Sequence, residues 1–234
     1  IYKEQALYDV AIEYFYKSLE ICEVNNSTGH IASIYNNIAS IYRAQNKFDD
    51  AIEMYKKALD YCKKNDNKVL EAKILNNIAV VYESIENYDE ALNYYNQSLD
   101  VFDELDYKKG IATLYSNIGG IYFIKNELDK ALSNLKTAYD LFTKTADKLG
   151  LISCLIKTGE VYFSQNNLLV SLAKFKEAEV FAIQLNTKEY LSDIYFNYSL
   201  IYEKNNDYTA AYKYYKKHSE LKDSLFTIEK AELI

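Results

Sequence analysis

Residues that could carry catalysis or bind a metal are few and scattered in this chain. His30 and His218 stand near opposite ends of the 234-residue sequence, so they are not expected to share one site. A metal centre or a serine–histidine pair needs such residues within bonding distance. The three cysteines form no Cys-x-x-Cys motif, and their odd number argues against a disulfide framework. The sequence therefore predicts no enzyme, no metal site and no cofactor.

The surroundings of the cysteines and glycines also indicate structure rather than chemistry. Cys154 occupies a position that is isoleucine or leucine at intervals of 40 residues, and Cys22 and Cys62 occupy one that is phenylalanine in two later periods. Gly119-Gly120 lies inside a helical pattern, not in the loop between a strand and a helix that cradles phosphate. We therefore expect thiols in the core and no nucleotide site.

Charge and hydropathy exclude two further classes of partner. The formal net charge is −7, and lysine pairs are spread among acidic residues, whereas nucleic-acid binding needs a clustered positive face. No apolar run approaches the roughly 18 residues of a membrane span. We expect no direct nucleic-acid binding and no membrane contact. The chain begins at Ile1 rather than methionine, so we expect it to be a piece of a longer protein.

Hydrogen-bonding side chains recur at one position of a 40-residue period. They are Asn37, Asn77, Asn117, Lys157 and Asn197. A carboxamide both donates and accepts, so a row of them can pair with an extended backbone whatever its side chains. The same amides could instead hydrogen-bond within their own helix turns or to the neighbouring repeat, and both interpretations are open. Lys157 interrupts the row and is expected to prefer an acidic side chain or a carboxylate.

The elements that must position this row are helices arranged in repeats. One column of the period is always tyrosine, and a column of small residues stands three positions before it. These columns are Tyr42, Tyr82, Tyr122, Tyr162 and Tyr202, and Ala39, Ala79, Gly119, Gly159 and Ser199. Self-similarity at a fixed period indicates a repeat architecture, and the apolar spacing within each period is helical. Most tyrosines are therefore predicted to pack in the core, and the small column to mark close helix crossings.

Each period is predicted to be an antiparallel pair of helices. Short polar turns such as "AQNK" join the two helices of a pair, and longer polar stretches such as "LDYKKG" and "TADKLG" join one pair to the next. A single pair cannot bury its apolar face alone, so the pairs must stack. We predict one all-α solenoid domain over residues 1–234. It comprises a half repeat at 1–27, repeats at 28–67, 68–107, 108–147, 148–187 and 188–227, and a helical extension at 228–234.

The phrase Ala39-x-x-Tyr42, followed by Phe48-x-x-Ala51, resembles the tetratricopeptide repeat (TPR) family, and the resemblance covers almost the whole chain. The period of 40 rather than 34, and the absence of the family's proline, are similar to the longer repeats of kinesin light chains and several bacterial signalling proteins. The chain resembles the TPR regions of Bacteroidetes-type sensor kinases and transcription regulators, and its C-terminal stretch resembles the junction that follows such repeats there. The resemblance implies a right-handed superhelical solenoid that binds a protein or peptide in its concave groove, without catalysis.

The resemblance also implies where a partner would bind and in what setting. In TPR proteins of similar repeat length an asparagine at the recurring position contacts peptide backbone, which implies that role for the four asparagines of the row. The other residues expected on this face are Arg43, Phe123, Phe163 and Phe196. The three phenylalanines would hold the apolar side of an amphipathic segment, or would pack between repeats. A sensory or regulatory role in bacterial signalling is implied, in the cytoplasm or, as the alternative, in the periplasm.

Two other functions stand as alternatives. A scaffold could self-associate, as a homodimer, through apolar residues spaced along the C-terminal helix. These are Leu221, Leu225, Phe226 and Ile228. A small-molecule sensor would instead show one deep pocket with perturbed titrating groups. A strictly monomeric chain would weaken the first alternative.

Overall fold

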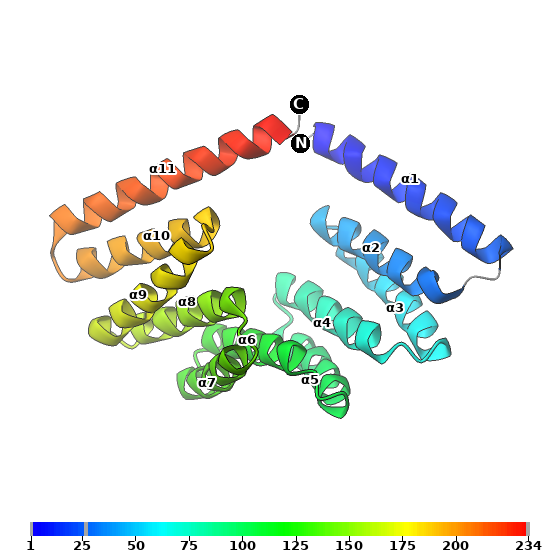
Figure 1. The fold of residues 1–234 in the computed structure, drawn as a ribbon, viewed down its shortest axis with the longest axis horizontal. Helices are drawn as coiled ribbons and strands as arrows, with labels where there is room; N and C mark the ends of the chain where they lie inside the picture. The colour runs from blue at the N-terminus through cyan, green and yellow to red at the C-terminus, as the bar shows by residue number, and fades with distance from the viewer. Residues whose placement is uncertain (1, 26–27, 233–234) are drawn as a thin grey trace. The chain divides into compact units, whose positions relative to one another are not determined.

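The computed structural model describes residues 2–25 and 28–232, and it is helical almost throughout that part of the chain. The described residues form α-helices and one short 3₁₀ helix, η1, and no strand (Figure 1). The elements are α1 (Tyr2–Val24), η1 (Thr28–His30), α2 (Ile31–Ala44), α3 (Phe48–Lys64), α4 (Lys68–Ser84), α5 (Tyr88–Glu104), α6 (Lys108–Ile124), α7 (Leu128–Lys144), α8 (Lys148–Ser164), α9 (Leu168–Gln184), α10 (Lys188–Lys204) and α11 (Tyr208–Glu232). The prediction of an all-α solenoid is confirmed.

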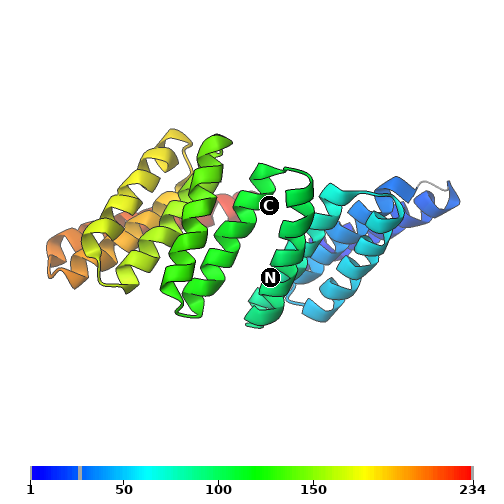
Figure 2. The same cartoon turned by 90° about the horizontal axis from the view of Figure 1, so that it is seen from below.

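The chain divides into two compact units, Ile1–Leu114 and Tyr115–Ile234, with the division inside α6. Within the first unit α2 packs against α3 and α4 against α5, and within the second α8 packs against α9 and α10 against α11 (Figure 2). In each repeat the even-numbered helix comes first and the odd-numbered helix second. The single domain over residues 1–234 and the right-handed superhelix stay predictions. Ile1 and residues 26–27 and 233–234 fall outside the described part.

The connections from α2 to α11 are all three residues long, whether they lie within a repeat or between repeats. The prediction of longer connections between repeats is therefore wrong. In "LDYKKG" the residues Lys108, Lys109 and Gly110 belong to the first turn of α6, and in "TADKLG" the residues from Lys148 onward begin α8. Polar residues and glycine in an exposed first turn have the composition of a loop. This composition explains why longer connections were predicted.

Eight of the nine three-residue connections close the preceding helix with the same two backbone bonds, and the connection Asn65–Asn67 has one of them. At the end of α2, the Asn46 N–H donates to the Arg43 carbonyl and the Lys47 N–H to the Tyr42 carbonyl, each at 2.9 Å. These two bonds form a Schellman motif, which requires a left-handed residue at its centre. The central residues all have positive φ: Asn46, Asp66, Glu86, Asp106, Asn126, Ala146, Asn166, Asn186 and Asn206. Seven of the nine are asparagine or aspartate, the side chains that tolerate this conformation best.

Apolar side chains from both helices of each repeat fill the cores of the two units. In the first unit Ile38, Tyr55 and Ile78 are fully buried, and in the second Leu155 and Phe175 are buried. Cores of this kind stabilise a helix pair only when the next pair covers them. The predicted burial of Cys62 and Cys154 is confirmed, whereas Cys22 is half-buried.

The column of small residues allows close contact between the helices of one repeat, as predicted. A Cβ added at Gly119 would lie 2.9 Å from Leu135 Cγ, and one added at Gly159 would lie 2.8 Å from Phe175 Cζ. In the first unit Ala39 is fully buried at the equivalent place. The small residue therefore accommodates the bulky side chain of the second helix.

Candidate functional site

Asparagines at the predicted position form an amide cluster in the first unit. The Asn77 Nδ2 group on α4 donates to Asn36 Oδ1 on α2 at 3.0 Å. Asn36 Nδ2 donates to Asn37 Oδ1 at 3.5 Å, and Asn76 Nδ2 donates to Asn77 Oδ1 at 3.4 Å. Asn37 is exposed, and Asn77 is half-buried. The cluster therefore links two successive first helices while keeping amide atoms at the surface.

A pocket of about 410 Å³ lies beside this cluster. Its lining residues come from α2, α4, the end of α5, the connection between α5 and α6, and the first half of α6. They are Asn36, Leu70, Lys73, Asn76, Asn77, Phe102, Tyr107, Lys109, Gly110, Thr113 and Leu114. The lining combines amide and hydroxyl groups, apolar side chains and two lysines, and it contains no carboxylate. A peptide could therefore find both hydrogen-bonding partners and apolar contacts here.

The sequence analysis missed the two lysines and the threonine of this pocket. Lys73 stands four residues before Asn77, and Thr113 stands four before Asn117, so each is one helical turn from the predicted row. Following the faces of the first helices by one more turn would have found these two. Lys109 extends the same line by a further turn.

In the second unit Lys157 takes part in a different arrangement. Its Nζ donates to the Ser116 carbonyl at 3.2 Å and to Asn117 Oδ1 at 3.4 Å, so the lysine on α8 bridges to α6. Asn197 Nδ2 donates to the Asp193 carbonyl of its own helix at 2.9 Å. These bonds are the ones expected if the row stabilises the repeats. A bound partner would contact the same amide and ammonium groups through further hydrogen bonds, and this role stays a prediction.

Acidic groups accompany Lys157 on the first helices of the second unit. Burial raises the pKa of Glu160, while the nearby Lys157 ammonium draws that pKa down. Burial also raises the pKa of Asp193, against the attraction of His218 and Lys222. This face therefore carries both signs of charge, unlike the pocket of the first unit.

The predicted aromatic residues lie at the surface to different degrees. Phe123 and Phe163 are half-buried, and the Lys204 ammonium lies 4.7 Å from the centre of the Phe163 ring. Phe196 is 39% exposed, and its ring lies 5.2 Å from that of His218. Arg43 is exposed in the last turn of α2 and does not line the pocket of the first unit. The rings therefore make packing contacts and also offer apolar surface.

The histidines make structural contacts. His30 is exposed and stands at the N-cap of α2. His218 Nδ1 lies 2.9 Å from Ser192 Oγ and 3.0 Å from the Ser192 carbonyl, so it packs onto α10 of its own repeat. Three repeats earlier in the chain, Ser98 Oγ donates to the carbonyl of Ala72, the residue equivalent to Ser192. His218 therefore replaces a small residue and reaches the same backbone position.

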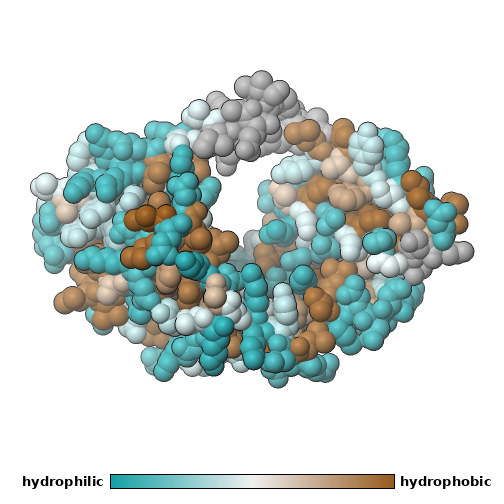
Figure 3. Space-filling model, in the orientation of Figure 1, coloured by the Kyte–Doolittle hydropathy of each residue, from teal (hydrophilic) through white to brown (hydrophobic). Residues whose placement is uncertain are grey.

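A metal site needs several ligand side chains close together, and a membrane-spanning helix needs a long apolar stretch. Hydrophilic and hydrophobic residues are interleaved over the face of each unit in Figure 3. Among the residues that the structure describes, no three histidine, cysteine, aspartate or glutamate side chains are grouped to hold a metal ion. None of the described helices combines the length and apolar character needed to cross a membrane.

Comparison with known proteins identifies the architecture. The sequence profile of the tetratricopeptide repeat matches residues 1–64, 30–104 and 110–182, and a second profile of the same description matches residues 192–224. The chain belongs to the tetratricopeptide repeat family. None of the curated proteins compared with this TPR chain matches it.

Several solved structures share the fold of this TPR chain. BtubC (BKLC) from P. vanneervenii superposes with a TM-score of 0.77 at 16% identity, over 96% of this chain and 92% of that chain. A second similar structure, from Pyrococcus horikoshii, is a Signal Transduction ATPase with Numerous Domains that has a tetratricopeptide repeat sensor. It superposes with a TM-score of 0.76 at 19% identity, over 99% of this chain and 36% of that chain. A Rap protein complexed with competence and sporulation factor superposes with a TM-score of 0.67 at 17% identity, over 95% of this chain and 60% of that chain. At these identities the likeness shows the fold alone.

Proposed function

We propose that this TPR chain is a non-catalytic module that binds an extended segment of a partner protein on the first helices of its repeats. The observation that supports this most is the pocket of the first unit, where the amide cluster of Asn36, Asn76 and Asn77 stands beside apolar side chains and two lysines. Amides can pair with any peptide backbone, while a pocket selects side chains.

The chemistry of the pocket describes the segment that would fit. Leu70, Phe102 and Leu114 offer apolar contact to one side chain of the partner. Lys73 and Lys109 place positive charge beside it, and no carboxylate lines the pocket. An apolar residue with an acidic neighbour is therefore the preferred occupant. The surrounding amides would hold its backbone.

A regulatory setting is proposed on the basis of the similar structures. One of them contains a tetratricopeptide repeat sensor, and another is a Rap protein in complex with a competence and sporulation factor. A sensory or regulatory module of a bacterial signalling protein is consistent with both. We place it in the cytoplasm, where its three free thiols would stay reduced.

Site-specific photo-crosslinking tests the proposed surface. A photoreactive phenylalanine analogue at Thr113, an exposed pocket residue, should capture a partner in cells, whereas the same residue at Asn96, exposed on α5, should not. The crosslinked peptide, read by mass spectrometry, would give the sequence of the bound segment. Equal capture at both positions, or capture at Asn96 alone, would contradict the proposal.

Self-association is the second candidate, because the last helix exposes aromatic side chains. Tyr208, Tyr212 and Tyr215 on α11 are 66%, 70% and 53% exposed, which is far more than their counterparts within the stack. Phe226 is 57% exposed, Leu221 and Leu225 are half-buried, and the side chain of Ile228 lies outside the described part. Sedimentation over a wide concentration range should show dimers that Tyr212→Lys abolishes, and a mass that stays monomeric would exclude this candidate.

A further inference from the structure

A second pocket of about 410 Å³ lies in the second unit, on the side of the second helices. It is lined by α7, α8 and α9, and its lining includes Tyr139, Leu155, Thr158, Tyr162 and Lys174. It contains no residue of the recurring asparagine row and none of the predicted phenylalanines. The pocket is therefore separate from the surface proposed above, and its function can be tested independently.

Aromatic rings fill the equivalent position one repeat later. The Tyr202 and Tyr214 rings stack there at 5.4 Å with an angle of 2° between their planes. Tyr198 meets Tyr214 edge-on at 4.9 Å. In the first unit Tyr82 and Tyr94 form the same stack at 5.4 Å and 12°. The tyrosine of the second helix thus covers the tyrosine of the first helix in both places.

The repeat that forms the pocket keeps only one of these rings. In the 40-residue register, Tyr198, Tyr202 and Tyr214 correspond to Thr158, Tyr162 and Lys174. Tyr162 is therefore present, but a threonine and a lysine stand where the last repeat has two further rings. The first column is isoleucine in the earlier repeats, and in the five full repeats the second is aromatic only at Tyr94 and Tyr214. Among the described residues Tyr162 has no aromatic neighbour in stacking range, and the space where a ring would lie is part of the pocket.

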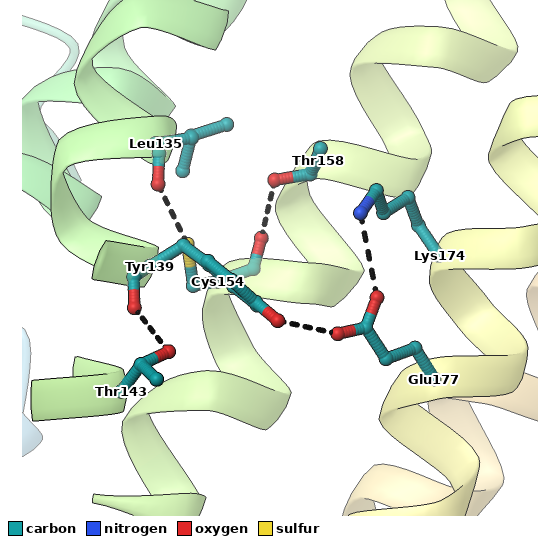
Figure 4. Close-up of polar contacts among 7 residues, drawn as sticks. All are labelled: Leu135, Tyr139, Thr143, Cys154, Thr158, Lys174 and Glu177. Atoms are coloured by element: carbon teal, nitrogen blue, oxygen red, sulfur yellow. Dashed lines mark hydrogen bonds and ion pairs between the residues drawn. The ribbon is translucent and has the colours of Figure 1, made fainter. Parts of the chain in front are cut away.

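Lys174 is held at the wall of this pocket. Its Nζ lies 3.3 Å from Glu177 Oε2, and the Tyr139 hydroxyl donates to Glu177 Oε1 at 2.6 Å (Figure 4). The Lys174 ammonium also lies 5.7 Å from the centre of the Tyr139 ring. A lysine that already makes a cation–π contact would favour a further aromatic ring over an aliphatic group.

We propose that this pocket binds an aromatic side chain of a partner polypeptide, which completes the stack on Tyr162. Offset-stacked rings attract beyond the effect of buried area, and the volume is within the range of ligand pockets. The rings at the equivalent positions are side chains carried by a helix, so the occupant with the same geometry is a tyrosine, phenylalanine or tryptophan of a bound chain.

Methyl NMR with small probes tests this assignment. The methyl groups of Leu132 and Leu155 line the pocket and would report a ring that enters it. N-acetyl-tyrosine amide should shift these signals in a saturable way, while N-acetyl-leucine amide at the same concentration should not. Lys174→Tyr should abolish the shifts, because the new ring would occupy the pocket as Tyr94 and Tyr214 do. Lys176→Tyr, on an exposed position of the same helix, is the matched control and should leave the shifts unchanged.

The same variants have a second readout. Lys174→Tyr should raise Tm by about 2–4 °C through the restored stack, and Lys176→Tyr should not. Thr158→Tyr, which introduces the ring that the last repeat carries at Tyr198, should also block the probe. Equal shifts with both amides, or shifts that persist in Lys174→Tyr and Thr158→Tyr, would overturn the proposal. Binding of 4-hydroxyphenylacetate without binding of the tyrosine amide would overturn the assignment to a polypeptide.

Discussion

The central residue of each three-residue connection decides how a helix of this protein ends. Its φ lies near +50° to +60°, a region in which a side chain with a Cβ costs about 1–2 kcal/mol. Asparagine and aspartate reduce that cost through local hydrogen bonds. Ala146, with φ of 53°, and Glu86, with φ of 59°, lack that advantage. Backbone strain is therefore concentrated at two of the connections.

Glycine at these two positions should stabilise the protein. Ala146→Gly removes the Cβ that opposes the left-handed conformation, and we expect a gain of about 1 kcal/mol in the free energy of unfolding and a rise of about 2–4 °C in Tm. Glu86→Gly should act in the same direction. Asn126→Gly, at φ of 59°, is the matched control and should change Tm much less. Thermal unfolding that ranks the control above Ala146→Gly would contradict this explanation.

The thiols should differ in reactivity according to their burial. Burial raises the pKa of Cys62 and of Cys154 from 9.0 to about 11, and the Cys154 Sγ donates to the Leu135 carbonyl at 3.1 Å. The thiolate is the reactive form. With a disulfide reagent at pH 8 we expect only the half-buried Cys22 to react in the folded chain, and all three thiols after unfolding. Rapid reaction of Cys154 in the folded chain would contradict the described core.

The two buried thiols, Cys62 and Cys154, should make the free energy of unfolding fall as the pH rises. The raised pKa values mean that the folded chain binds these protons more tightly than the unfolded chain. Their contribution to stability is complete below pH 9 and is lost as the pH rises towards about 11. Cys154→Ala should flatten this part of the curve of stability against pH, which denaturant titrations at several pH values would measure.

Helix α6 contains two adjacent glycines in different environments. Substitutions at the two positions can therefore distinguish the effect of helix propensity on stability from the effect of packing. A Cβ at Gly119 would lie 2.9 Å from Leu135 Cγ, whereas a Cβ at Gly120 would have Lys157 Nζ as its nearest neighbour, at 3.7 Å. The first position is thus restricted by the second helix of the repeat, and the second has room for a methyl group. Alanine is the better helix former at both.

Alanine substitutions at the two glycines should therefore have opposite effects. Gly120→Ala should raise the free energy of unfolding by about 0.5–1 kcal/mol, because alanine loses less backbone entropy in a helix. Gly119→Ala should lower it by about 1–3 kcal/mol, because Leu135 must move. Each variant serves as the control for the other in a chemical denaturation series. Stabilisation by both would show that the helix crossing is looser than described.

Much of the element structure could be predicted from the sequence, because it depends on periodicity. The 40-residue columns fix which faces of the helices are buried, and Tyr55, Gly119 and Cys154 lie where that pattern places them. The lengths of the connections could not be predicted from composition, since Lys108, Lys109 and Gly110 form a helical turn. The run of asparagine and aspartate at 20-residue intervals was a signal for left-handed turns that went unused.

The binding surfaces were predictable only in part. The asparagine row was visible in the sequence, but its hydrogen bonds depend on which side chains meet across helices, as Asn77 meets Asn36 and Lys157 meets Ser116. The pocket beside Tyr162 was less accessible to sequence reasoning, because the two columns that flank it are mixed. The Thr158 column is isoleucine in three repeats, and in the five full repeats the Lys174 column is aromatic only at Tyr94 and Tyr214. Comparing the repeats residue by residue would have shown which repeats lack the second ring, but not that a pocket forms beside Tyr162.

For the whole molecule, the most direct measurement is affinity capture from cell lysate with quantitative mass spectrometry. Wild-type protein should enrich a partner that Asn77→Ala/Asn117→Ala fails to retain. Asn93→Ala/Asn96→Ala, which removes two exposed amides from the second helix α5, should retain it. All three proteins must have the same Tm, since Asn77 also bonds to Asn36. A partner that only Asn77→Ala/Asn117→Ala fails to retain would support binding on the first helices. Equal recovery of the partner by all three proteins would contradict it.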